Sequence, residues 1–114
     1  MDERIKTLAK NLVNYSCRVK AGDKVYINYT GPSTEDLTRQ LVKEVYAAGG
    51  LPFVHYINPK IQREVLMNCT EEQLKLMADL AAREMSQMDC YIGVRGSDNV
   101  SELSDVPADK MNLY

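Results

Sequence analysis

The amino-acid sequence predicts an α/β fold, in which a small parallel sheet is flanked by helices. Three short runs rich in β-branched and aromatic residues alternate with segments whose apolar residues recur at helical spacing. The three runs cover residues 24–29, 51–57 and 89–95. Because helical crossovers join parallel strands through right-handed connections, we expect a three-layer arrangement with strand order 2-1-3, half of a doubly wound Rossmann-like fold.

The chain opens with a helix that we expect to pack on the sheet. Within residues 2–16 the apolar residues form one stripe of a helix, at Ile5, Leu8, Ala9, Leu12 and Val13. A turn through Gly22 then leads to the first strand. In that strand Val25 and Ile27 share one face and Tyr26 lies on the other, so we expect the strand to be buried on both sides.

A second helix is expected over residues 34–48. Ser33 or Thr34 is expected to cap its amino end, because a hydroxyl oxygen there accepts a hydrogen bond from a backbone amide of the first turn. Glycine tolerates the left-handed conformation that commonly follows a helix, so Gly49-Gly50 predicts where this helix ends.

Two helices are predicted between the second and third strands. The first covers residues 60–68, and the second covers residues 71–88. Thr70 and Gln73 form a capping box at the start of the second helix. Its apolar stripe is expected to fill the core beneath the sheet, and consists of Leu74, Met77, Ala78, Ala81, Met85 and Met88.

The segment after the third strand contains a loop and two weaker helical patterns. The loop covers residues 96–99, and a short helical piece is predicted over 100–103. Pro107 suits the first position of a further helix, because proline needs no amide partner there.

The composition fits one domain spanning residues 1–114. Hydrophobic residues make up 45% of the chain and charged residues 26%, a balance that is ordinary for a globular protein. A net charge of -2 gives no electrostatic footprint for nucleic acid or an anionic membrane. No apolar run approaches the roughly 20 residues that span a bilayer, and charged residues directly follow Met1 where a signal peptide would be apolar. We therefore expect a cytoplasmic protein.

The three cysteines, Cys17, Cys69 and Cys90, are predicted to be reduced and mostly buried. They are odd in number, lie far apart and form no CxxC pair, which argues against a disulfide framework or a zinc cluster. A reduced cysteine packs as a small hydrophobic residue.

Three loops are expected at the carboxyl ends of the strands, where open parallel sheets bind ligands. They cover residues 30–34, 58–60 and 96–99. Backbone amides near Ser33 are candidates for holding an anion. The loop from Thr30 to Thr34 has one glycine where the dinucleotide fingerprint needs three, and it lacks the Gly-Lys-Ser/Thr of a P-loop. An ordinary capped loop is therefore favoured.

No other pattern assigns a catalytic, cofactor-binding or metal-binding residue. His55 is the single histidine, and its place inside a strand favours a strand-face or interface role. Arg95 and Asp98 could face a cleft, but an exposed ion pair is favoured. The seven tyrosines lack the clustered basic residues that stacking on nucleic acid requires.

Two acidic pairs also have a structural explanation. Both lie in the first turn of a predicted helix, where the helix dipole favours negative charge. These pairs are Glu35-Asp36 and Glu71-Glu72.

The order and spacing of several segments resemble the amino-terminal part of an enzyme family. Between Leu12 and Val25 the chain has the pattern Leu-Val-x-Tyr-Ser followed by Val-Lys-x-Gly-Asp-Lys-Val. The likeness continues through DLTRQLVKEVYAAGGLPFVHY and TEEQLKLMADLAAREMSQMDCYIGVRGSDNVSELSDVPADKM. These segments cover nearly the whole chain and resemble the aminopeptidase T and aminopeptidase S family, the thermophilic-type metalloaminopeptidases. Ala21 stands where such sequences often have proline.

The resemblance implies a non-catalytic amino-terminal domain of a longer enzyme that removes amino-terminal residues from peptides. Family members hold two divalent metal ions, of the zinc, cobalt or manganese class, in a carboxyl-terminal domain. No segment of this chain matches that ligand-bearing region, so no catalytic residue, cofactor or metal ligand is assigned here. The expected partner is the missing catalytic domain, and the chain alone is expected to be an inactive piece that walls the active-site cavity.

Two other functions stay open. The chain could be a free-standing small-molecule or phosphate-binding domain that uses loop 30–34. It could instead be an assembly module, in which an exposed sheet edge or the helix after Pro107 pairs two copies as a homodimer.

Overall fold

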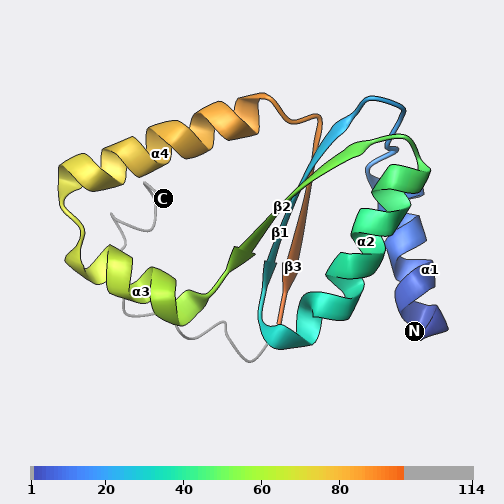
Figure 1. Cartoon of the computed structure of the whole chain (residues 1–114), viewed down its shortest axis with the longest axis horizontal. Coiled ribbons are helices and arrows are strands. Elements are labelled where there is room, and N and C mark those ends of the chain that lie inside the picture. The colour runs from blue at the N-terminus through green and yellow to red at the C-terminus, as the bar shows by residue number, and fades with distance from the viewer. Residues whose placement is uncertain (1, 97–114) are drawn as a thin grey trace.

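The computed structural model describes residues 2–96, and Figure 1 shows how their helices and strands are arranged. In chain order the elements are α1 (Glu3–Asn11), the π-helical turn η1 (Leu12–Ser16), β1 (Lys24–Thr30), the 3-10 turn η2 (Pro32–Thr34), α2 (Glu35–Ala47), β2 (Leu51–Ile57), α3 (Pro59–Asn68), α4 (Glu71–Ser86) and β3 (Cys90–Arg95). Loop residues 97–99 and the helical pieces predicted at 100–103 and from Pro107 lie outside the described residues.

The three strands form one parallel sheet with the predicted order, β2-β1-β3. β1 is central, and its register places Ile27 opposite Val54 of β2 and Ile92 of β3. In Figure 1, α1 and α2 lie on one side of the sheet, and α3 and α4 lie on the other. The predicted α/β fold with three parallel strands is confirmed.

The main hydrophobic core lies between the sheet and the layer formed by α1, η1 and α2. Val25 and Ile27 of β1 are fully buried in it. The helical layer contributes Ala9, Val13, Leu41 and Val45, all with no exposed surface. Burying one such aliphatic side chain stabilises a fold by about 1.5–3 kcal/mol, so this covered face of the sheet is where the fold gains most of its stability.

The carboxyl end of α2 is closed by two glycines, as predicted. The Gly49 amide donates to the Tyr46 carbonyl at 3.0 Å, and the Gly50 amide donates to the Val45 carbonyl at 2.9 Å. These two bonds define a Schellman motif. Gly49 has a φ of +83°, and a Cβ on Gly50 would lie 2.7 Å from a methyl carbon of Val19. Both positions therefore require glycine.

The amino end of α2 differs from the prediction, because neither Ser33 nor Thr34 caps it. Thr34 occupies the N-cap position, but no side chain accepts a hydrogen bond from an amide of the first turn. The buried Thr34 hydroxyl donates instead to the Gly31 carbonyl at 2.7 Å and lies 3.2 Å from the Thr30 carbonyl. The 3-10 turn η2 places this hydroxyl beneath the helix start, where it satisfies carbonyls of the preceding turn.

The second face of the sheet, which we call the open face, is covered less completely than the first. Tyr26 and Asn28 of β1 are half-buried there. Phe53 of β2 is 38% exposed, and Tyr91 of β3 is 51% exposed. The prediction that β1 is buried on both sides is therefore wrong, because apolar side chains on both faces of a strand do not ensure that a helix packs closely on each.

The helices α3 and α4 form a hairpin with a small core of its own. Leu66, Cys69 and Leu74 are buried together and separately from the main core. Figure 1 shows that only the carboxyl end of α4 approaches the sheet. Of the apolar stripe predicted to fill the core beneath the sheet, Leu74 alone is buried; Met77, Ala78, Met85 and Met88 are half-buried, and Ala81 is exposed. That prediction is wrong, since periodicity identifies a stripe but not what covers it.

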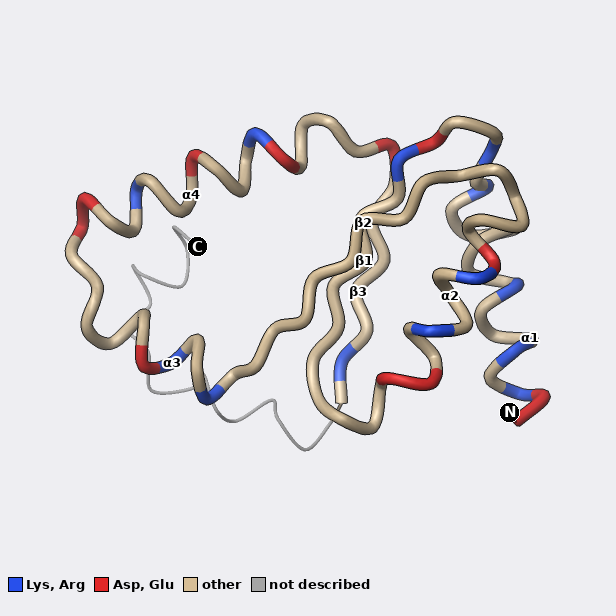
Figure 2. The backbone as a smooth tube through the Cα atoms, in the orientation of Figure 1, with Lys and Arg blue, Asp and Glu red and all other residues tan. Residues whose placement is uncertain are grey.

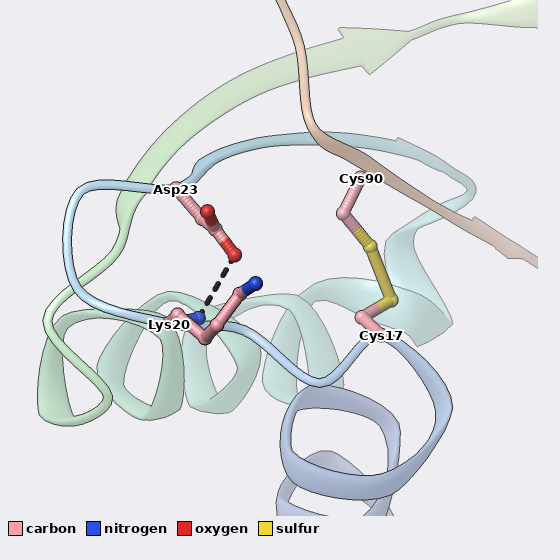
Figure 3. Close-up of a disulfide and its surroundings, with 4 residues drawn as sticks. All are labelled: Cys17, Lys20, Asp23 and Cys90. Atoms are coloured by element: carbon pink, nitrogen blue, oxygen red, sulfur yellow. Dashed lines mark hydrogen bonds between the residues drawn. A yellow bond between two sulfur atoms is a disulfide. The ribbon is translucent and has the colours of Figure 1, made fainter.

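The cysteine prediction is also corrected, because Cys17 and Cys90 form a disulfide (Figure 3). Their Cα atoms lie 6.2 Å apart, although 73 positions separate the two residues in the chain. β3 pairs with β1, and this pairing brings Cys90 to the covered face, close to the end of η1. Cys69 is buried in the α3–α4 hairpin, as predicted. Sequence spacing alone could not reveal a pair that the strand order creates.

Candidate functional site

The most distinctive group of polar and aromatic side chains lies on the open face of the sheet. His55 Nε2 lies 2.9 Å from Glu84 Oε2, so the histidine of β2 pairs with a carboxylate of α4. The His55 ring stacks on Tyr26, with ring centroids 5.0 Å apart. Tyr26 also meets the ring of Tyr91 edge-on at 6.3 Å. We call these four residues the open-face cluster.

The strand register and the end of α4 position the open-face cluster. Tyr26 of the central strand lies opposite Tyr91 of β3, and His55 lies on the neighbouring strand β2. The Tyr91 hydroxyl donates to the Met85 carbonyl at 2.8 Å, next to Glu84 in the last turns of α4. Two contacts therefore fasten the carboxyl end of α4 to the open face.

The prediction for His55 as a strand-face residue agrees with this geometry. Its partner Glu84 was not predicted, because 29 positions separate them and their contact depends on the path of α4. The His55 and Glu84 side chains are 44% and 36% exposed. A polar contact that is this exposed contributes at most about 1 kcal/mol, so the His55–Glu84 contact adds little stability.

The described residues do not provide a metal centre. Among residues 2–96, no three His, Cys, Asp or Glu side chains converge closely enough to hold a metal ion. A two-metal hydrolase needs several such ligands around each pair of ions. The His55–Glu84 pair supplies one nitrogen and one carboxylate, which fall short of that requirement. The residues of this segment therefore do not fit a two-metal site.

In loop 30–34, the candidate anion site, the polar groups of Thr34 are directed inward, whereas Ser33 is exposed. The Thr34 amide donates to the Gly31 carbonyl at 3.2 Å, and Pro32 has no amide hydrogen. Glu35 and Asp36 follow at once in the first turn of α2, where their charge would repel an anion. This arrangement is that of a structural turn, although it lacks the side-chain cap that the sequence predicted.

In the second loop at the same edge of the sheet, residues 58–60, the polar side chain of Asn58 is also used for a structural purpose. The Asn58 side chain caps α3 by accepting hydrogen bonds from the Lys60 amide at 3.0 Å and the Ile61 amide at 3.4 Å. Arg95 is exposed at the end of β3. Its predicted partner Asp98 lies outside the described residues, and so does the rest of the third loop after Gly96.

Charged residues are spread over the described surface in both signs (Figure 2). The acidic pairs lie in the first turns of α2 and α4, as predicted, at Glu35-Asp36 and Glu71-Glu72. Within residues 2–96, no helix has the length and apolarity needed to cross a membrane.

These features define a parallel α/β domain whose open face carries a cluster of aromatic and polar side chains. A model of the family described as "Thermophilic metalloprotease (M29)" matches residues 1–114. The chain belongs to the thermophilic metalloprotease family, as its sequence resemblance predicted.

The fold is similar to a solved structure of a longer protein. Wild-type AmpT from Thermus thermophilus superposes with a TM-score of 0.67 and is 23% identical in sequence. The match covers 97% of this chain and 29% of the AmpT chain. At this identity the likeness shows a shared fold. Among proteins with curated functions, no match was found.

Proposed function

We propose that these 114 residues are the amino-terminal, non-catalytic domain of a longer metal-dependent aminopeptidase. The observation that carries the proposal is the family match over residues 1–114 together with a structural match that spans 29% of AmpT. In this proposal residues 1–114 fold as one domain of a cytoplasmic protein.

The proposal assigns the chemistry to polypeptide outside residues 1–114. Two divalent ions of the zinc, cobalt or manganese class would be held there and would activate water for hydrolysis of the peptide substrate. The domain described here would wall the cavity and position the catalytic part. No residue of this chain is assigned a catalytic step.

Exposed apolar side chains are consistent with a domain that packs against the catalytic part of a longer chain. On α4, Leu76 is 59% exposed and Leu80 is 60% exposed, and their spacing of four places them on one side of the helix. Phe53 and Tyr91 are also exposed on the open face. Large apolar patches on a soluble domain mark surfaces that contact other protein. We propose that the rest of the longer chain covers them.

A peptidase assay tests the catalytic part of the proposal. The 114-residue chain is incubated with amino-acid p-nitroanilides and short peptides, with zinc, cobalt or manganese added in turn. We expect no metal-dependent release of an amino-terminal residue. Saturable hydrolysis that requires one of these metals, and that chelation abolishes, would contradict the proposal because it would place a complete centre in this chain.

A light-scattering experiment tests whether the exposed apolar surface of α4 is a contact surface. We expect the isolated chain to self-associate weakly with rising concentration, because the exposed leucines of α4 lack their cover. Changing Leu76→Glu should abolish this association, and the matched change Lys75→Glu at a neighbouring exposed position should not. A stable dimer that Leu76→Glu leaves intact would favour the assembly module instead, with a homodimer as its working form.

A further inference from the structure

We propose that Cys17 and Cys90 form a thiol–disulfide exchange site, which small dithiols open and oxidised dithiols close while the domain stays folded. The proposal concerns the cross-link between η1 and β3 and rests on the cytoplasmic location given under the proposed function. Disulfides are rare in reducing compartments, and those found there are usually transient, catalytic or redox-sensing. A single disulfide in a domain of cytoplasmic type is therefore expected to be exchangeable.

The disulfide is open to solvent at a polar hollow. The hollow is lined by Cys17, Arg18, Lys20, Asp23 and Asp89. Cys17 and Cys90 are each half-buried, whereas Cys69 is 8% exposed. Figure 3 shows the bond close to the loop that carries Lys20 and Asp23. A reductant can reach Cys17 from the hollow, and the same reductant has little access to Cys69.

The hollow carries two cations, Arg18 and Lys20, and two carboxylates, Asp23 and Asp89. Asp23 accepts a hydrogen bond from the Lys20 amide at 2.9 Å, and Asp89 accepts one from the Lys24 amide at 2.8 Å. Both carboxylates are held in place by backbone amides and keep their negative charge, so the cations of the hollow are balanced in number. Arg18 and Lys20 form no ion pair with any residue in the described range 2–96. Cations beside a sulfur stabilise its thiolate form, which is the reactive and the leaving form in exchange.

The geometry assigns the order of the exchange step. A thiolate of the dithiol attacks the Cys17 sulfur from the hollow, a new sulfur–sulfur bond forms to Cys17, and the Cys17–Cys90 bond breaks with its electron pair leaving on Cys90. The second thiolate of the dithiol then attacks the dithiol sulfur that is bonded to Cys17. This step closes the dithiol into a ring and releases Cys17 as a thiolate. The protein disulfide gains two electrons and two protons, and the dithiol becomes a cyclic disulfide.

Noncovalent contacts hold both ends of the cross-link in place when it is open. Val13 of η1 and Ile92 of β3 are buried in the main core. The Asp89 amide donates to the Lys24 carbonyl at 2.8 Å, which fixes the entry into β3. These contacts keep the two cysteines close together after reduction, so that oxidation restores the same pair.

A redox titration tests the proposal on the full 114-residue chain. The protein is equilibrated at pH 7 without denaturant in mixtures of reduced and oxidised dithiothreitol, quenched in acid, and labelled in denaturant with a maleimide polymer. We expect one labelled thiol per chain in oxidising mixtures and three in reducing mixtures, with an unchanged far-UV circular dichroism spectrum. The Cys69→Ser variant is the matched control and should give no labelled thiol in oxidising mixtures and two in reducing mixtures.

The rate of reduction tests the role of the cations. Arg18→Gln and Lys20→Gln should each slow reduction by dithiothreitol about two- to fivefold at low ionic strength, because the anionic dithiol that attacks Cys17 from the hollow loses a stabilising charge. The control Lys75→Gln removes an exposed cation from the distant helix α4 and should leave the rate unchanged.

Three results would count against the proposal. Three labelled thiols in protein equilibrated with oxidised dithiothreitol would show that the disulfide does not form. Reduction that occurs only after denaturant is added would show a buried structural bond instead of an exchange site. Equal slowing by Lys75→Gln and Arg18→Gln would remove the cations of the hollow from the mechanism.

Discussion

Opening the Cys17–Cys90 cross-link is expected to lower the free energy of unfolding by about 4.5 kcal/mol at 25 °C. The two cysteines are separated by 73 positions, so the bond closes a loop that contains β1, β2 and all of α2, α3 and α4. Stability is lost because reduction favours the unfolded state. Without the cross-link, the unfolded chain gains the conformations that a closed loop of this length forbids. Small domains are stable by about 5–15 kcal/mol in total, so the reduced form should remain folded but become marginal.

Urea unfolding followed by far-UV circular dichroism measures this loss. With an m-value of about 2 kcal/mol/M, reduction should move the midpoint down by about 2 M. The Cys69→Ser variant should show the same response to reductant, because Cys69 lies outside the cross-link. The double variant with Cys17→Ser and Cys90→Ser should unfold at the lower midpoint with or without reductant. A shift below about 0.5 M between oxidised and reduced wild-type protein would refute the reasoning.

Three further predictions concern the core, a cap and the first helix. Ile27→Ala should lower the free energy of unfolding by about 2–5 kcal/mol in urea titrations, because Ile27 is fully buried in the central strand. The control Ile61→Ala, at a position that is 64% exposed, should change it by less than about 0.5 kcal/mol. Gly50→Ala should lower the thermal midpoint in calorimetry, since its new methyl group would lie 2.7 Å from a valine methyl carbon, and an unchanged midpoint would contradict that clash. The Arg4 backbone amide, and then the Arg4 guanidinium, hold the pKa of Asp2 below its ordinary value of 3.8. Because the pKa is lower in the folded state, the ionised cap stabilises α1 above about pH 4 and the contribution is lost as the pH falls through the folded-state pKa. The difference in helical circular dichroism between wild type and Asp2→Ala should therefore be constant near neutral pH and vanish in acid; a difference that persists in acid would contradict this origin.

The sequence was sufficient to predict the parts of this fold that depend on local chemistry. The end of α2 at Gly49-Gly50 follows from a conformation that glycine adopts readily, and the structure has the expected pair of bonds. Thr70 accepts a hydrogen bond from the Gln73 amide at 3.0 Å, as the capping box predicted. The strand order followed from the handedness of crossovers, which is the same in nearly all parallel sheets.

The features that were not predicted depend on contacts between distant segments. Cys17 meets Cys90 because β3 lies beside β1, and no spacing rule contains that information. His55 meets Glu84 because α4 returns to the open face at its carboxyl end. The stripe on α4 has helical periodicity, but periodicity is the same whether a sheet, a hairpin partner or another polypeptide covers it.

The separate core of the α3–α4 hairpin has a consequence for how the domain fluctuates. Leu66, Cys69 and Leu74 are buried with one another, and within residues 2–96 their cluster is separate from the main core. A subdomain with so few buried contacts opens at a lower free-energy cost than the sheet and its helical layer. The amide hydrogens of α3 and α4 would therefore exchange with solvent through partial opening, long before those of β1, and the domain would behave as two cooperative units rather than one.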